Sequence, residues 1–326
     1  MMLKNTLQMA VRRFAAGIDV SPSAARLVVL SRRARGEGPV RVECVASVPL
    51  RAGAMAGAEI VDRQAVARAL GELFECLPSE RILYALRCAM AVPGSATLTA
   101  SVPVSHFGLL RRGQRGSAIA HATFEAAVMI EAERIAGVER HALAVDWYIT
   151  EAPHDAGSVT IAATARQHLE ARLECAAIAG MSLTAIDSEP HAALRALRHA
   201  ADHEPCAEDA YAALWLGPDG LYGWRVVDDT VVAEVRYPGP EYADIAEALR
   251  DLGGGQPLGR ALVAGELDLL DGISFSLADI GDVLACGVVP FQCAAFGEVV
   301  RASDPTLPYE PACAVAFGLA LRGVLE

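Results

Sequence analysis

Residues Phe14 to Leu30, FAAGIDVSPSAARLVVL, decide the fold of this chain. The apolar run predicts a strand that ends near the carboxylate of Asp19. Ser21-Pro22-Ser23 predicts a tight turn, because proline presets φ and serine hydroxyls bond nearby backbone groups. A second strand follows from Arg26, since the next residues are rich in strand formers. The stretch therefore predicts a β-hairpin with an aspartate beside its turn, a pattern that also occurs in hairpins that bind nothing.

The overall composition is that of a folded protein with more than one core. The chain has 326 residues, of which 53% are hydrophobic and 21% charged. This length is enough for two domains or one large bilobed unit. The net charge of −12 argues against a broad nucleic-acid-binding face. We therefore expect a globular protein without a nucleic-acid partner.

Targeting and metal-binding signals are not evident. We expect residues 1–13 to form a tail rather than a signal peptide, because Arg12 and Arg13 follow the apolar part of the segment. The apolar run Ala312 to Leu321 is far shorter than the ~20 residues of a membrane span. The eight cysteines include no CxxC pair and the eight histidines no HExxH motif. We expect a reducing, cytoplasmic location, no disulfide framework and no metal site.

The first half of the chain predicts the order β-β-β-α-β. After the opening hairpin, alternating residues predict a strand over Val40–Val48, and a one-sided apolar pattern predicts a helix over Gln64–Phe74. A buried strand is predicted over Arg81–Val92, where Pro93-Gly94 ends it. Further strands are predicted at Thr97–Val104, Val145–Ile149, Val159–Ala165 and Leu183–Asp187, and further helices at Ser117–Ala136, Gln167–Gly180 and Glu189–Ala201.

The second half repeats the same order. Strands are predicted at Tyr211–Leu216, Tyr222–Val227 and Val231–Tyr237, with Asp228-Asp229 as a hairpin turn. A helix over Tyr242–Leu252 and a strand over Ala261–Ala264 complete the repeat. A short element at Asp279–Leu284 and a closing helix over Pro311–Leu321 follow. The two halves form an internal repeat of elements, although their residues do not match.

We expect structural roles for three further sets of residues. Arg111, Arg112 and Arg115 are expected in a solvated loop, with an anion site as the alternative. Glu131 and Glu133 point in different directions on a helix, so we expect surface charge rather than paired catalytic carboxylates. In the helix over Gln167–Gly180, we expect the core face to consist of Leu169, Leu173, Ala176 and Ala177.

Four segments stand out in this order: the opening GIDVSPSAARLVVL, EAERI followed by VDW, the stretch Ile161–Asp187, and the closing PACAVAFGLALRG. On these segments the chain resembles the PilM family of actin-like type IV pilus assembly proteins. The resemblance implies an α/β, actin-like (ribonuclease H-like) two-lobed fold with a shortened second lobe. The implied domains are a tail (1–13), a first lobe (14–205) with an inserted subdomain at about 95–165, and a truncated second lobe (206–326).

The resemblance also implies where a nucleotide would bind. The corresponding loops are degenerate: Pro22 and Pro218 remove backbone N–H donors, Trp215 occupies an aspartate position, and Glu266 adds a carboxylate that repels phosphate. Only residues 238–260 stand where the family has a whole subdomain. We therefore expect no catalytic residue and weak or absent binding of ATP and magnesium. The residues that line the degenerate loops are Asp19, Ser21, Ser23, Gly217 and Gly265.

The family's role implies a cytoplasmic adaptor rather than an enzyme. PilM-like proteins bind the cytoplasmic N-terminal segment of the inner-membrane protein PilN, so the resemblance implies such a partner and a peripheral membrane location. The alternatives are an active actin-like ATPase, which could form filaments, and a small-molecule kinase. A kinase would need a general base in the cleft. Asp187 and Asp219 are the candidates, although their positions favour strand-end and turn roles.

Overall fold

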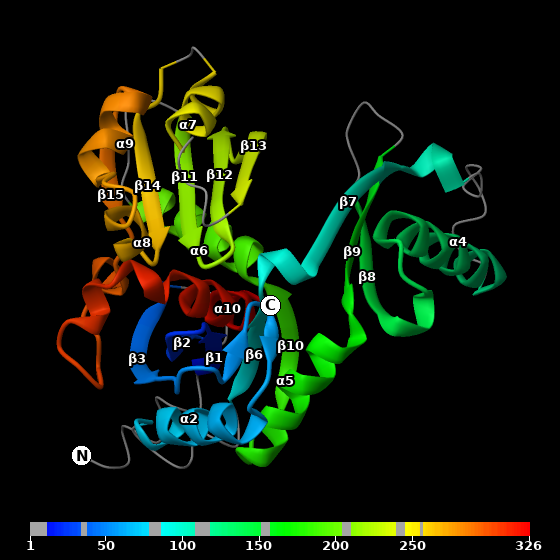
Figure 1. Ribbon diagram of the computed structural model, residues 1–326, viewed down its shortest axis with the longest axis horizontal. Helices are drawn as coiled ribbons and strands as arrows, with labels where there is room; N and C mark the ends of the chain where they lie inside the picture. Colours follow the sequence, from blue (N-terminus) through cyan, green and yellow to red (C-terminus); the bar gives the residue numbers. More distant parts are fainter. Residues whose placement is uncertain are drawn as a thin grey trace. The chain divides into compact units, whose positions relative to one another are not determined.

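The computed structural model describes residues 12–33, 38–77, 86–107, 118–150, 157–203, 210–238, 245–254 and 257–326. It divides into two compact units: an inserted unit, Val92–Arg172, and a main unit made of Met1–Ala91 and Leu173–Glu326 (Figure 1). The predicted tail up to residue 11, the loop with Arg111, Arg112 and Arg115, and the lobe boundary near 205 lie outside the described residues.

The first sheet of the main unit has the strand order β10-β6-β1-β2-β3. The predicted hairpin is confirmed, since β1 is antiparallel to β2 and ends at the predicted turn. β1 is also parallel to β6, which starts at Arg87. The first part of the predicted strand, residues 81–85, lies outside the described residues. The strands are β1 (Arg12–Val20), β2 (Ala24–Arg33), β3 (Arg41–Pro49), β6 (Arg87–Val92) and β10 (Leu183–Ser188).

The second sheet has the order β13-β12-β11-β14-β15. The first sheet, read from its other edge, is β3-β2-β1-β6-β10, so the strands of the two sheets correspond one to one in the order of the chain. The internal repeat is therefore confirmed at the level of topology. Asp228 and Asp229 both have positive φ, 46° and 59°, as a tight hairpin turn of the I′ type requires. The strands are β11 (Ala210–Gly217), β12 (Gly220–Val227), β13 (Thr230–Pro238), β14 (Arg260–Gly265) and β15 (Gly287–Pro290).

Two helices lie between these sheets, α6 (Glu189–His203) and α10 (Ala314–Leu325). Residues of both helices and both sheets form one buried cluster, so the two repeats share a core. The helices cross closely at Gly318, where a Cβ atom would collide with the backbone carbonyl of Ala192. Gly17 on β1 permits an equally close approach to α10. The short 3₁₀ turn Pro311–Cys313 precedes α10, so the predicted closing helix starts slightly later than expected.

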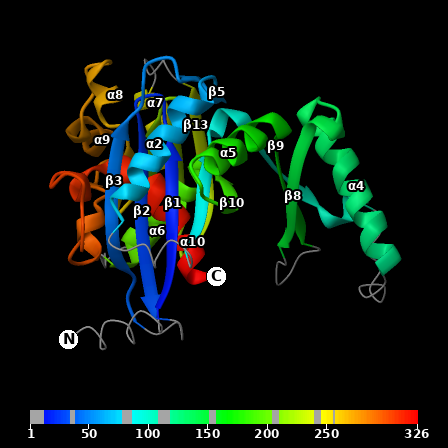
Figure 2. The same ribbon diagram turned by 90° about the horizontal axis from the view of Figure 1, so that it is seen from below.

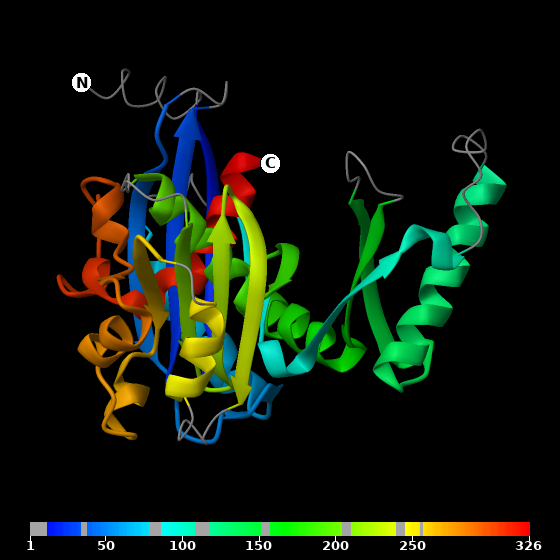
Figure 3. The same ribbon diagram turned by 90° about the horizontal axis from the view of Figure 1, so that it is seen from above.

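Other helices cover the outer faces of the sheets. α2 (Arg63–Glu75) packs on β2 and β3 (Figure 2). α7 (Ile245–Gly253) packs on β12 and β13 (Figure 3) and on α9 (Leu277–Leu284). Its buried face is the predicted one: Ile245, Ala248, Leu249 and Leu252. Among the described residues between β13 and β14, α7 is the only regular element. The short elements β4 (Met55–Ala56), β5 (Glu59–Ile60) and α8 (Asp268–Asp271) complete the main unit.

The core face predicted for α5 (Arg166–Ile178) is confirmed at Ala176, which is buried, but is wrong at two positions. Leu173 is 47% exposed and Ala177 is exposed as well. The other buried positions are Ala171, Arg172 and Cys175. The prediction gave weight to leucine, whereas small side chains and the long stem of an arginine occupy this face.

The inserted unit is an antiparallel sheet covered by one helix. Strands β7 (Thr97–Pro103), β9 (Ser158–Ala165) and β8 (Leu143–Thr150) pair in that order. α4 (Ala118–Ala136) contributes Phe124 and Val128 to the core. The ring of Phe124 lies 5.3 Å from that of Phe107 and 5.1 Å from that of Trp147. The unit thus has a core of its own, as a domain requires.

Glu131 on α4 is not the surface charge that the sequence predicted. Its side chain is buried, with Arg134 at 2.6 Å and His106 at 3.4 Å from its carboxylate oxygens. The hydrogen bond from Arg134 is the main cause that lowers the pKa of Glu131. Glu133, two positions on, is partly exposed. The two carboxylates do diverge, but the helix buries one of them beside Arg134 and His106.

Candidate functional site

The turns of the two repeats meet within the main unit. Asp19 is the penultimate residue of β1, and Ser21 and Ser23 lie in the turn to β2. Gly217 ends β11 and Gly265 ends β14, the parallel neighbour of β11. Asp19, Ser21, Gly217 and Gly265 line one small cavity together. The structure therefore brings together the residues that the sequence assigned to the degenerate nucleotide loops, and Ser23 joins them through Glu266.

Glu266 is the centre of this arrangement. Its Oε1 accepts hydrogen bonds from Ser21 Oγ at 2.9 Å, from Ser23 Oγ at 3.0 Å and from Arg26 Nη2 at 3.1 Å. Its backbone N–H donates to the carbonyl oxygen of Leu216 at 2.9 Å, which fixes the residue at the end of β14. The hydroxyls and the cation of the first repeat thus bind a carboxylate of the second. We call Asp19, Ser21, Ser23, Arg26 and Glu266 the ionic cluster.

Arg26 supplies the positive charge of the ionic cluster. The hairpin register places Arg26 directly opposite Asp19, and Arg26 Nη1 lies 3.6 Å from Asp19 Oδ2. Only 9% of its side chain is exposed. Burial alone lowers the pKa of Arg26, but the carboxylates of Asp19 and Glu266 raise it above its usual value. The guanidinium is therefore held as a cation between two carboxylates.

The cavity beside the ionic cluster is too small for a nucleotide. Its volume is about 10 Å³, roughly the room that one water molecule needs. The indole of Trp215 covers Gly217, since a Cβ atom there would lie within 2.7 Å of the ring. Gly265 has a φ of 103°, and a Cβ atom at this position would collide with the backbone of Leu216. Packing of the strand ends explains both glycines without a ligand.

The sequence missed the role of Arg26 but contained a signal for it. A four-residue connection from Val20 to Ala25 places Asp19 and Arg26 across the hairpin, where opposite charges attract. The kinase candidate Asp187 is occupied elsewhere: its Oδ2 accepts from Arg195 at 2.8 Å and lies 3.5 Å from Arg322. Among the described residues, no group of three or more potential ligands is arranged to hold a metal ion.

Comparison with known proteins shows to which family the chain belongs. Residues 17–213 match the family model described as type IV pilus assembly protein PilM. The chain belongs to the PilM family. The matched range begins within β1, the strand that carries Asp19, and includes the other four strands of the first sheet. No sequence in the curated set of proteins matches the chain.

One solved structure supports membership of the PilM family at the level of the fold. The structure titled PilM-PilN type IV pilus biogenesis complex has a TM-score of 0.66 at 20% identity, covering 95% of this chain and 98% of its own. A Bacteroides thetaiotaomicron protein of actin-like ATPase fold gives 0.46 at 9% identity, with 86% and 92% covered. The protein EutJ of Carboxydothermus hydrogenoformans gives 0.44 at 14% identity, with 94% and 89% covered. The PilM-family fold here is actin-like.

This PilM-family chain is thus an actin-like protein of type IV pilus assembly. Within the part of the chain that the structure describes, no helix has both the length and the apolar character of a membrane span.

Proposed function

We propose that this protein is a non-hydrolysing adaptor in the assembly of a type IV pilus or a related secretion or uptake machine. In this proposal it is cytoplasmic and peripheral to the inner membrane, and it binds the cytoplasmic N-terminal segment of a PilN-like membrane protein. Its actin-like fold then serves as a rigid binding surface rather than as a nucleotide-driven machine.

The observation that supports the absence of hydrolysis is the position of Glu266. Phosphate groups bind where N–H and O–H donors converge. In this chain the hydroxyls of Ser21 and Ser23 converge on the carboxylate of Glu266 instead. ATP would have to displace a carboxylate that is paired with Arg26, and would then meet a like charge. The ionic cluster thus occupies the place of the ligand.

The adaptor role is supported by the family and by the structural neighbour, which is a PilM–PilN complex. Short segments of membrane partners commonly bind as an added strand or as a helix in a groove. The net charge of −12 suits a basic segment next to a membrane. We propose such a segment as the partner.

The alternative function is that of an ATP-binding actin-like protein. It is favoured by Asp19, which stands at the end of β1 where the resemblance places the aspartate beside the metal. It would require Arg26 to release Asp19 and Glu266 to leave the turn. A nucleotide would therefore have to open the ionic cluster before it could bind.

A titration with the partner peptide tests the adaptor role. A synthetic peptide with the N-terminal cytoplasmic sequence of the PilN-like protein encoded with this chain should raise its thermal midpoint. At 100 times the dissociation constant the linkage amounts to about 2.7 kcal/mol, which is roughly 4 °C for a protein of 326 residues. A peptide of the same composition in scrambled order is the control. No shift at saturating peptide, or an equal shift with the scrambled peptide, would contradict the proposal.

The Glu266→Gln variant separates the adaptor role from nucleotide use. Glutamine keeps an acceptor oxygen for the serine hydroxyls but removes the charge that opposes phosphate. We expect peptide binding to be unchanged in this variant. Peptide binding that is lost in Glu266→Gln, or that changes when ATP is added to the wild type, would favour the ATP-binding alternative.

A further inference from the structure

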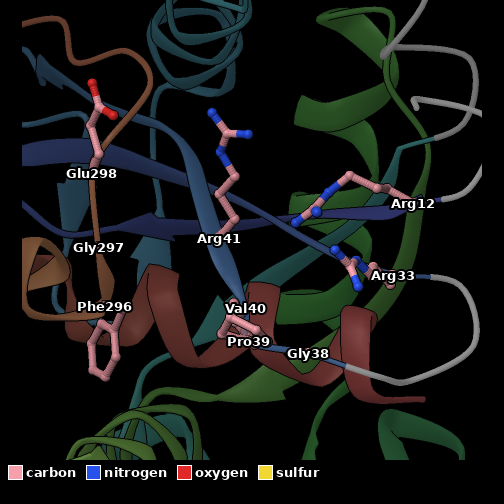
Figure 4. A pocket seen from close by; sticks show the side chains of 9 residues that line it. All are labelled: Arg12, Arg33, Gly38, Pro39, Val40, Arg41, Phe296, Gly297 and Glu298. Carbon is pink, nitrogen blue, oxygen red and sulfur yellow. The ribbon is translucent and has the colours of Figure 1, made fainter. Parts of the chain in front are cut away.

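A second and larger cavity lies at the opposite ends of β1 and β2 from the ionic cluster. Its volume is about 500 Å³, within the range of small-molecule sites. Figure 4 shows Arg12 and Arg33 at one side, Arg41 in the middle, and Phe296 and Glu298 at the other side. The lining is completed by Gly38, Pro39, Val40 and Gly297. We call it the arginine pocket.

The strand register places like charges face to face at this pocket. Arg12 on β1 lies directly opposite Arg33 on β2, and the next pair along the hairpin is Arg13 with Arg32. Like charges directly opposite each other on neighbouring strands destabilise a sheet. Residues opposite each other share a face, so Arg12 and Arg33 project to the same side. An anion between them would convert a repulsive pair into a binding site.

Arg12 is held in place before any ligand arrives. Its Nε donates to Ser31 Oγ at 2.8 Å and its Nη2 donates to the Ser31 carbonyl oxygen at 3.1 Å. Glu43 lies 3.9 Å from Arg12 Nε and 3.8 Å from Arg41 Nε, so one carboxylate serves two guanidinium groups. Arg12, Arg33 and Arg41 carry three positive charges and Glu43 one negative charge, so this end of the pocket has a net positive charge.

The pKa of Arg12 also reflects the positive charges that surround it. Burial lowers the pKa of Arg12, and the positive charges of Arg41 and Arg33 lower it further, while Glu43 raises it. Arg33 and Arg41 are therefore close enough to Arg12 for their charges to disfavour its own. Planar guanidinium forks match phosphate oxygens in pairs, and this makes arginine the preferred residue for phosphate recognition.

The opposite wall of the pocket is apolar and fixed. The ring of Phe296 lies 4.7 Å from that of Phe317 and 5.0 Å from that of His199, with interplanar angles of 30° in both cases. Pro39 and Val40 add further apolar surface. Glu298 on this side disfavours a second anionic group and accepts hydrogen bonds from amino or hydroxyl groups. The pocket is thus positive at one end and apolar, with an acceptor, at the other.

We infer that the arginine pocket binds a small phosphate-bearing ligand, with its phosphate at Arg12, Arg33 and Arg41 and its uncharged part beside Phe296. The site is separate from the small cavity lined by Asp19, Gly217 and Gly265, which we call the closed cleft. The inference does not depend on the adaptor role. The phosphate could belong to a soluble mononucleotide-like molecule or to a phospholipid headgroup. Both present the same phosphate chemistry to the pocket.

Binding to defined probes tests the site in the full chain. The soluble probes are inorganic phosphate and AMP, measured by isothermal titration calorimetry. The membrane probe is a set of phosphatidylcholine vesicles that contain about 30% phosphatidylglycerol, and binding is measured by co-sedimentation. The anionic lipid is included because a negatively charged surface attracts basic sites. The variant is Arg33→Gln with Arg41→Gln, which leaves Arg12 and its bonds to Ser31 intact. The control variant is Arg68→Gln, which removes an exposed arginine of α2 that does not line the pocket.

We expect saturable binding in one arm that the double variant weakens at least about tenfold, as the loss of charge-assisted hydrogen bonds predicts. Arg68→Gln should bind like the wild type. Binding of AMP or phosphate identifies a soluble ligand, and binding of vesicles alone identifies a headgroup. No binding in any arm overturns the inference, and so does binding that persists in the double variant or falls equally in Arg68→Gln.

Discussion

Arg26 and Glu266 are 240 positions apart in the sequence, and Arg26 Nη2 donates to Glu266 Oε1 across 3.1 Å. Arg26 belongs to β2 of the first sheet and Glu266 follows β14 of the second. Their contact joins the two repeats at the point where the resemblance to actin-like proteins places a nucleotide. The carboxylate of Glu266 and the guanidinium of Arg26 therefore occupy the position where a nucleotide would be expected.

Removing the cation should destabilise the protein. In Arg26→Met, Asp19 and Glu266 lose their shared partner while Asp19 stays buried. We expect a loss of about 2–4 kcal/mol in the free energy of unfolding, at or slightly below the usual cost of breaking a buried pair. The loss is limited because 21% of the Glu266 side chain is exposed. Urea unfolding followed by tryptophan fluorescence measures it. Arg68→Met on the exposed face of α2 is the control, and equal losses in both variants would contradict the role of Arg26.

Two glycine-to-alanine changes should act in opposite directions. At Gly318 the new methyl group would collide with the Ala192 carbonyl oxygen, so α10 and α6 could not approach. We expect Gly318→Ala to cost more than about 3 kcal/mol. At Gly71 within α2 nothing lies within 4 Å, so Gly71→Ala should stabilise by up to about 1 kcal/mol. Thermal unfolding by circular dichroism compares them. Similar midpoints for both variants would show that the α6–α10 crossing tolerates a side chain.

His199 should make stability depend on pH. Burial, and then the neighbouring His203, lower the pKa of His199 from 6.5 to about 4. The unfolded chain therefore takes up a proton at this residue before the folded protein does, and stability is lost as the pH falls from about 6.5 to about 4. We expect a loss on the order of 1–2 kcal/mol, discounted because the residue is only partly buried.

The variant His199→Phe tests this assignment, since phenylalanine keeps ring contact with Phe296 and Phe317 without titrating. Its unfolding free energy should vary less between pH 6.5 and 4 than that of the wild type. His141→Gln, at an exposed position, should retain the wild-type dependence. A pH dependence that is unchanged in His199→Phe would assign the effect to other groups.

The order of elements could be predicted from the sequence because local signals mark each turn. Ser21-Pro22-Ser23 and Asp228-Asp229 are such signals, and both hairpins are confirmed. The apolar spacing in α7 gave its buried face correctly, because that helix packs on one sheet only. The short strand β15 was not predicted, since four residues carry no period and their pairing with β14 is decided by the fold.

Burial of polar and small residues could not be read from the sequence. Glu131 is buried because His106 and Arg134 lie beside it, and α5 buries Cys175 rather than Leu173. The loops of the closed cleft could be located from the family resemblance. Their closure could not, because it depends on Glu266 reaching residues of the first hairpin. The arginine pocket likewise combines residues 12–41 with residues 296–298.

Calorimetric titration of the purified protein with Mg-ATP tests the central claim most directly. In the double variant Arg33→Gln with Arg41→Gln, which disables the arginine pocket, we expect no heat of binding up to millimolar ATP. The double variant is needed because a phosphate-bearing ligand could otherwise bind at that pocket. Micromolar binding of ATP that persists in the double variant and is lost in Asp19→Asn would show that the ionic cluster opens for nucleotide, and would contradict the account.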